Sequence, residues 1–69
     1  MDIHWEVRRD PESLRLWSLE MLDDTIVGCA GPFRDEDAAQ EGIDTAVPFE
    51  RNGELLRWLL RRNLQRIPS

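Results

Sequence analysis

Residues 14–30 decide the fold, and they read LRLWSLEMLDDTIVGCA. Residues 14–22 are predicted to form a strand, in which alternate side chains point to opposite faces. One face carries Arg15, Trp17, Leu19 and Met21, and the other carries Leu16, Ser18, Glu20 and Leu22. Asp23 and Asp24 predict a tight turn. Residues 25–30 are β-branched and then small, which predicts a short third strand that another backbone segment can approach closely.

A further strand is predicted before this hairpin. Ile3, Trp5 and Val7 alternate with polar residues, which is typical of a half-buried strand. Residues 10–13 read Asp-Pro-Glu-Ser and predict a turn, because proline presets φ and aspartate bonds its own backbone. The first thirty residues therefore predict a three-stranded antiparallel β-meander.

A helix is predicted after the sheet, which Gly31 and Pro32 are expected to end. Residues 35–37 are acidic, as favoured at a helix N-terminus by its free N–H groups and its dipole. Pro48 is expected to end this helix. Apolar or small residues recur at helical spacing at Ala39, Gly42, Ile43, Ala46 and Val47. Gly42 costs about 1 kcal/mol inside a helix, so we expect close packing there to be its reason.

A second helix is predicted from Asn52 or Gly53 to about Arg66, before Pro68. Its apolar residues span about half of its circumference, which is wider than one surface helix needs. These are Leu55, Leu56, Leu59, Leu60, Leu64 and Ile67. The helix is therefore expected either to lie between two surfaces or to offer part of its apolar face to a partner. The predicted fold class is α+β, in the order β-β-β-α-α.

Charge divides the chain into two parts within one predicted domain, residues 1–69. Residues 1–50 carry thirteen Asp or Glu and four Arg, a net charge of −9. Residues 51–69 carry five Arg and one Glu, a net charge of +4, which brings the whole chain to −5. An acidic β-β-β-α unit followed by a basic amphipathic helix suggests that the helix docks on its own body, on a second copy or on a partner.

Size and composition narrow the function classes. A chain of 69 residues buries only about 60% of its unfolded surface, so its core is marginal. The chain has one cysteine, Cys29, and one histidine, His4. One cysteine cannot form an internal disulfide, and these two side chains are too few to hold a structural zinc ion. Unusually good packing or oligomerisation is therefore the expected means of stabilisation. We expect no cofactor, no metal, a cytoplasmic location and no membrane span.

Residues 3–47 resemble the YegP-like domains of unknown function, which are small β-β-β-α units. The similar positions are Leu16-Trp17-Ser18-Leu19, the Asp23-Asp24 turn, Ile26-Val27-Gly28, Phe33 and Ala39-Gln40-Glu41-Gly42-Ile43-Asp44. This resemblance implies the fold and a tandem or dimeric association, but no chemistry. The stretch from Gly28 to Ala39 is also similar to HicB-type antitoxins, and the stretch from Phe33 to Ala39 to plant-type three-stranded DNA-binding domains.

The candidate functional site is an interface on the C-terminal helix. Trp and Arg are enriched at the residues that dominate interface energetics, and an arginine over an indole adds a cation–π interaction. The candidate interface residues are Leu55, Arg57, Trp58, Leu59, Arg61, Arg62 and Arg66. The alternative is that Trp58 lies on the domain's own sheet. We predict a small non-enzymatic protein–protein interaction module that forms homodimers.

Two other functions remain open. One is an inhibitor from a phage or mobile element, whose acidic face occupies a basic nucleic-acid channel of a host enzyme. The other is a nucleic-acid-binding or antitoxin-like module that uses the arginines of the C-terminal helix, with weak and strongly salt-dependent binding. The acidic residues 35–37 and the Asp23-Asp24 pair are interpreted as a helix start and a turn, and Cys29 as a buried packing residue.

Overall fold

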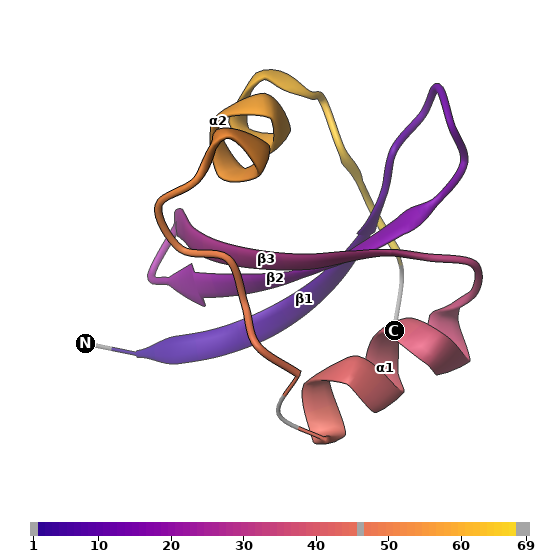
Figure 1. The fold of residues 1–69 in the computed structure, drawn as a ribbon, viewed down its shortest axis with the longest axis horizontal. Helices are drawn as coiled ribbons and strands as arrows, with labels where there is room; N and C mark the ends of the chain where they lie inside the picture. Colours follow the sequence, from indigo (N-terminus) through magenta and orange to yellow (C-terminus); the bar gives the residue numbers. More distant parts are fainter. Residues whose placement is uncertain (1, 46, 68–69) are drawn as a thin grey trace.

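The fold is a four-stranded antiparallel sheet with one helix on each face (Figure 1). The computed structural model describes residues 2–45 and 47–67. The elements in chain order are β1 (Ile3–Arg9), β2 (Leu16–Leu22), β3 (Thr25–Phe33), α1 (Glu36–Asp44), α2 (Glu54–Arg61) and β4 (Gln65–Arg66). The strand order in the sheet is β3-β2-β1-β4. The predicted α+β class and the order of three strands followed by two helices are confirmed, and the short β4 adds to them.

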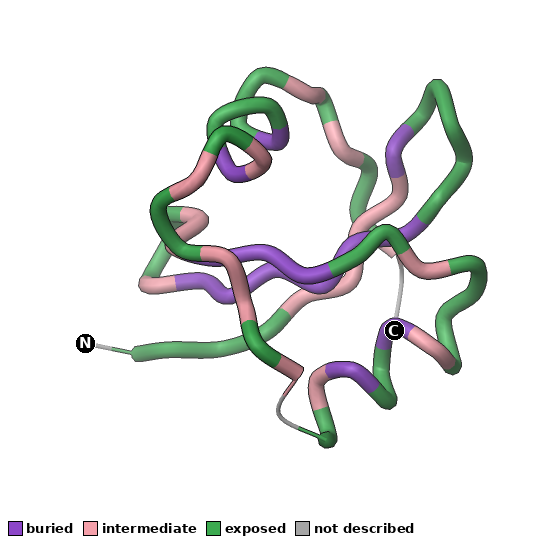
Figure 2. The backbone as a smooth tube through the Cα atoms, viewed as in Figure 1, coloured by how far each residue is buried: buried purple, intermediate pink, exposed green. Residues whose placement is uncertain are grey.

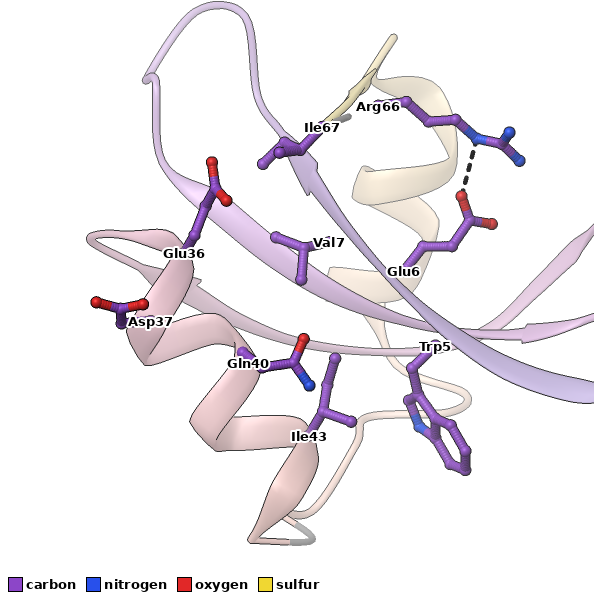
Figure 3. A pocket seen from close by; sticks show the side chains of 9 residues that line it. All are labelled: Trp5, Glu6, Val7, Glu36, Asp37, Gln40, Ile43, Arg66 and Ile67. Atoms are coloured by element: carbon purple, nitrogen blue, oxygen red, sulfur yellow. Dashed lines mark ion pairs between the residues drawn. The ribbon is translucent and has the colours of Figure 1, made fainter. Parts of the chain in front are cut away.

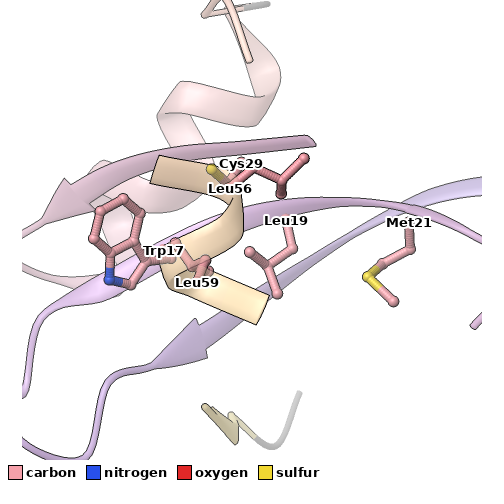
Figure 4. Packing of buried hydrophobic residues seen from close by; sticks show 6 residues of the cluster. All are labelled: Trp17, Leu19, Met21, Cys29, Leu56 and Leu59. Carbon is pink, nitrogen blue, oxygen red and sulfur yellow. The ribbon is translucent and has the colours of Figure 1, made fainter. Parts of the chain in front are cut away.

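The central strand β2 is buried on both faces, as Figure 2 shows along the middle of the sheet. One set of its side chains, Trp17, Leu19 and Met21, packs with Leu56 and Leu59 of α2 (Figure 4). The opposite set faces α1, where the Ser18 hydroxyl donates a hydrogen bond to the Ala39 carbonyl at 2.8 Å. The alternation predicted for this strand thus supplies two packed layers from one segment.

The strand boundaries differ from the prediction at two places. β2 begins at Leu16 rather than Leu14, because Leu14 has φ 62° and closes the preceding turn through a hydrogen bond to the Asp10 carbonyl. β3 continues through Gly31 and Pro32 to Phe33, so the prediction that these two residues end the sheet was wrong. Proline is tolerated there because β3 is an edge strand. Gly31 has φ 139°, which favours glycine.

The start of α1 is confirmed in detail. Asp35 is the N-cap, and its carboxylate accepts a hydrogen bond from the Ala38 N–H at 2.8 Å. The helix ends at Asp44, not at Pro48, and Thr45 caps it. Gly42 faces the Phe33 ring, and a Cβ at this position would lie 2.8 Å from the ring. Close packing is therefore the reason for this glycine. Ala46, predicted to face the sheet, lies outside the described residues.

The C-terminal helix is much shorter than predicted. α2 ends at Arg61, and Arg62 has an extended backbone. The chain then crosses to the far edge of the sheet, where Gln65 and Arg66 pair with Arg9 and Arg8 of β1. The prediction of a helix to about Arg66 was wrong, because the basic residues after Arg61 pair with acidic residues of the body instead of continuing the helical face.

Candidate interaction surfaces

The first surface, the Trp58 surface, contains the predicted interface on α2. Trp58 is 40% exposed and packs against Trp17 at 5.7 Å between ring centroids, with an interplanar angle of 51°. The Arg62 guanidinium lies over the Trp58 ring, 4.8 Å from its centroid. Trp58 thus lies on the domain's own sheet and still presents a large part of its ring to solvent.

Arg62 joins α2 to the turn between β1 and β2. Its guanidinium pairs with the buried Asp10 and, at 3.1 Å, with Glu12. The hydrogen bond from Arg62 lowers the pKa of Asp10 below its ordinary value. Asp10 also accepts hydrogen bonds from the Glu12 N–H and the Ser13 hydroxyl, both at 3.1 Å. The Asp10 carboxylate therefore stabilises the turn through hydrogen bonds and links the end of α2 to it through the ion pair with Arg62.

Arg66 likewise forms an ion pair with a carboxylate of its own chain, at the edge of the sheet. Its Nε lies 2.9 Å from Glu6 (Figure 3). Glu6 also contacts His4 and Arg8. Burial raises the pKa of Glu6, but the hydrogen bond with His4 and the two nearby arginines outweigh it, so this pKa is lowered. Two of the four predicted arginines thus bind the acidic body of their own chain.

The other predicted interface residues divide by burial. Leu59 is 1% exposed and belongs to the core, and Leu55 is partly buried beside it. Arg57 and Arg61 are exposed. The structure therefore brings together Trp58 and Arg62 beside the Trp17 ring, while Leu59 serves folding and Arg66 lies at the sheet edge.

The second surface was missed by the sequence analysis, and we call it the Trp5 surface. Trp5 is 46% exposed, and Ile3 on the same strand is 56% exposed. Trp5 lies opposite Glu20 in the β1–β2 register, so it belongs to the face that α1 covers. That helix packs on the sheet with the small residues Ala39 and Gly42, and it leaves the apolar side of β1 open.

Two grooves meet at Trp5. The larger, of about 490 Å³, lies between β1, the end of β4 and α1 (Figure 3). Its apolar lining is Trp5, Val7, Ile43 and Ile67, and α1 contributes Glu36, Asp37 and Gln40. The smaller, of about 360 Å³, shares Trp5 and Ile43 and continues along residues 47–49. Trp5 and Ile43 therefore form the middle of a continuous hollowed surface.

The two edges of the sheet are unlike each other. The middle of β3 is covered, because Cys29 and Glu50 exchange two backbone hydrogen bonds of 2.9 and 2.8 Å. On the opposite edge, β4 pairs only with Arg8 and Arg9. Among residues 2–45 and 47–67, no strand pairs with the outer edge of residues 3–7. Trp5 therefore lies on a stretch of sheet edge that is open to another strand.

The exposed side of α1 is mostly acidic. Glu36, Asp37, Glu41 and Asp44 are all exposed, and the helix contains no basic residue. By contrast, the carboxylate of Glu20 is 9% exposed and accepts two hydrogen bonds of 2.9 Å from Arg51. The carboxylates thus fall into a set that stabilises the fold and a set on α1 that faces solvent.

Cys29 is buried, and burial together with Glu50 raises the pKa of its thiol to about 11, which opposes nucleophilic reactivity. His4 lies 3.2 Å from Glu6 on an exposed part of β1. Within residues 2–45 and 47–67, no group of three or more His, Cys, Asp or Glu side chains is arranged to hold a metal ion. None of the helices described is long and apolar enough to cross a membrane.

Comparison with protein families, curated proteins and solved structures gives no match to this chain. The resemblance to YegP-like domains therefore remains a prediction.

Proposed function

We propose that the protein is a non-enzymatic protein-binding module and that the Trp5 surface is its main contact surface. The observation that carries this proposal is the position of Trp5, half exposed between two grooves on a stretch of sheet edge with which no described strand pairs. Tryptophan side chains that fill such positions often dominate binding energy at interfaces.

The chemistry of this surface suits an extended polypeptide. No described strand pairs with the edge of residues 3–5, so these residues can offer backbone N–H and C=O groups to an added strand, and the neighbouring grooves offer space for its side chains. The protein's own C-terminal segment already uses the adjoining part of this edge: β4 pairs with β1, Arg66 binds Glu6, and Ile67 lines the groove with Val7. A partner strand would continue the arrangement that β4 begins.

The Trp58 surface supports the same function less well. Arg62 and Arg66 are held by carboxylates of their own chain, so fewer charges remain for a partner. The same observation reduces the support for nucleic-acid binding, since Arg57 and Arg61 alone are a small basic patch.

Matched variants of the two exposed tryptophans test this proposal. A photo-crosslinking residue in place of the exposed Ile3, which leaves Trp5 intact, is expected to capture a discrete protein species in cells. The captured protein, once purified, should bind the wild-type chain and the Trp58→Ser variant but not Trp5→Ser. Loss of binding in Trp58→Ser with retention in Trp5→Ser would assign the function to the α2 side instead.

A second function is favoured by the acidic side of α1. Four exposed carboxylates on a helix with no basic residue suit a basic protein partner, as expected for an inhibitor that occupies a nucleic-acid channel. Binding to a nuclease or polymerase subunit should then weaken in a Glu36→Gln, Asp37→Asn, Glu41→Gln variant and at higher salt. A Glu54→Gln control on α2 should bind as the wild type does.

A further inference from the structure

We propose that the Trp58 surface binds a proline-rich polypeptide segment in the polyproline II conformation. The site is a groove of about 470 Å³ between the turn of residues 10–13, strand β2, Pro32 of β3 and the helix α2. It lies on the face of the sheet that α2 covers, so it is separate from the Trp5 surface and goes beyond the function proposed above. Its volume falls within the range of about 300–1,000 Å³ that is typical of ligand sites.

The apolar lining of this groove is two tryptophans and a proline. Trp17 is 4% exposed, whereas Trp58 is 40% exposed and Pro32 is exposed as well. The Trp17 ring is held firmly, because a Cβ added at Gly31 would lie 2.9 Å from its Cε3 atom. Grooves lined by aromatic rings are the usual docking sites of polyproline II segments. The lining is therefore largely formed before a ligand arrives, which favours affinity.

The acceptors of this groove are already in use. The Asp10 carboxylate accepts hydrogen bonds from the Glu12 N–H and the Ser13 hydroxyl. Arg62 then pairs with Asp10 and with the Glu12 carboxylate. A ligand that needs acceptors therefore gains little here.

Two donors of the same groove are not in use. The Trp17 Nε1–H is buried and has no acceptor among the residues that the structure describes. Figure 4 shows this nitrogen on the side of the ring away from Met21. Arg15 lines the groove and is exposed, and it takes part in none of the ion pairs formed within residues 2–45 and 47–67. An unpaired buried donor is unfavourable, so a ligand that supplies a carbonyl to it gains affinity.

A polyproline II segment has the hydrogen-bonding groups that this groove lacks. It forms no internal hydrogen bonds, so its carbonyls are free to accept, and each proline has no N–H to donate. A helix matches less well because its carbonyls are bonded internally, and an ordinary strand brings N–H donors for which the groove has no free acceptor. An apolar ligand rich in acceptors and poor in donors fits this site best.

The charges of the groove also favour an uncharged ligand. Its two arginines, Arg15 and Arg62, are matched in number by Asp10 and Glu12. Binding of a proline-rich segment should therefore change little with salt. Nucleic acid bound through the arginines of α2 would instead dissociate steeply as salt is added.

The buried position of the Trp17 nitrogen sets one requirement. A side chain of the groove has to turn before a ligand carbonyl can reach this atom. Rotamer changes of this kind are common at interfaces. Binding should therefore be reported by the Trp17 indole itself.

NMR titration of the ¹⁵N-labelled protein tests the site, because each of its three tryptophans gives one indole N–H resonance. The probe is a polyproline peptide of about ten residues, and the control is a Gly-Ser peptide of the same length, which is flexible. We expect the polyproline peptide to shift the Trp17 and Trp58 resonances and to leave Trp5 unchanged. A Trp17 resonance that does not move, a larger shift at Trp5, or an equal response to the Gly-Ser peptide overturns the proposal.

Matched variants locate the groove. Trp58→Ser should weaken binding of the polyproline peptide by at least about 10-fold, as expected for a tryptophan that dominates an interface. Arg15→Gln should weaken it by a smaller factor, and Trp5→Ser and Arg57→Gln, both outside the groove, should bind as the wild type does. Circular dichroism checks that each variant is folded. Equal weakening in Trp5→Ser and Trp58→Ser, or affinity that falls steeply with salt, overturns the assignment.

Discussion

The two faces of the sheet are completed in different ways. On the face of α2, the strand β2 supplies Trp17, Leu19 and Met21, and the helix covers them with Leu56 and Leu59. The polar side chains of β1 on this face, Glu6 among them, are paired with charged neighbours. On the face of α1, the apolar side of β1 extends beyond the helix and Trp5 stays half exposed. Both faces are packed by a helix, but the α1 face leaves an apolar part of β1 exposed.

The largest expected effect compares a core residue of the first face with Trp5. Leu59→Ala should lower the free energy of unfolding by about 2–5 kcal/mol, because it leaves a cavity under α2. Trp5→Ser should change it by less than about 1 kcal/mol when the chain is monomeric. Urea unfolding at low protein concentration measures both. Equal losses would mean that Trp5 belongs to the core and would remove the contrast between the faces.

A smaller effect is expected where α1 approaches the sheet most closely. Gly42→Ala places a Cβ 2.8 Å from the Phe33 ring, which should destabilise the fold by about 1–3 kcal/mol. The better helix preference of alanine offsets about 1 kcal/mol of this loss. Thermal unfolding beside a Glu41→Ala control at an exposed position of α1 checks the prediction. A stabilised Gly42→Ala variant would show that Phe33 moves aside easily and that α1 is loosely packed.

Acid should weaken the ion pairs that Glu6 and Asp10 form at the edge of the α2 face. The pKa values of Glu6 and Asp10 are lowered in the folded chain, so their stabilisation is present above the ordinary carboxyl pKa and is lost as pH falls through the folded values. The free energy of unfolding should therefore fall below about pH 4. Asp10→Asn should lose less stability than wild type on acidification, measured by urea titrations at several pH values. An identical loss in both would exclude Asp10 as a contributor.

The smallest effect concerns the reactivity of the Cys29 thiol, which lies in the core between β3 and α2. With a thiol pKa of about 11, roughly one molecule in 10,000 carries the thiolate at pH 7, and the side chain is buried as well. Iodoacetamide should leave the native protein unmodified and label it fully in urea, as mass spectrometry would show. Rapid labelling of the native protein would mean that the layer between β3 and α2 opens readily.

Local pattern was sufficient for most of the fold. The alternation in residues 16–22, the Asp23-Asp24 turn and the Asp35 cap are each dictated by neighbouring residues, and all three are present. The extension of β3 through Pro32 and the end of α2 at Arg61 depend on distant partners instead. Phe33 pairs with Leu16, and Arg62 binds Asp10. The helical periodicity of residues 55–67 does not depend on those contacts, so it predicted a longer helix than the one that forms.

The two candidate surfaces also differ in how far the sequence alone predicted them. Trp58 was found because tryptophan among arginines is conspicuous in the sequence, and the structure places it on Trp17 with Arg62 over it. Trp5 was assigned to a half-buried strand; the strand is present, but the expected burial of its apolar face is wrong for Ile3 and Trp5, which are exposed. The exposure of Trp5 depends on the shortness of α1 and on the strand order. A signal was available in the small residues of α1, which cannot cover a strand carrying Ile3, Trp5 and Val7.

The bridge between Cys29 and Glu50 limits what edge pairing can build. The connection between α1 and α2 pairs with the middle of β3, so that edge offers an added strand less room than an uncovered edge would. A molecule with two open edges polymerises into fibres, whereas a molecule with one gives a finite assembly. The two backbone hydrogen bonds between Cys29 and Glu50 therefore make open-ended edge-to-edge association less favourable than it would be with both edges free.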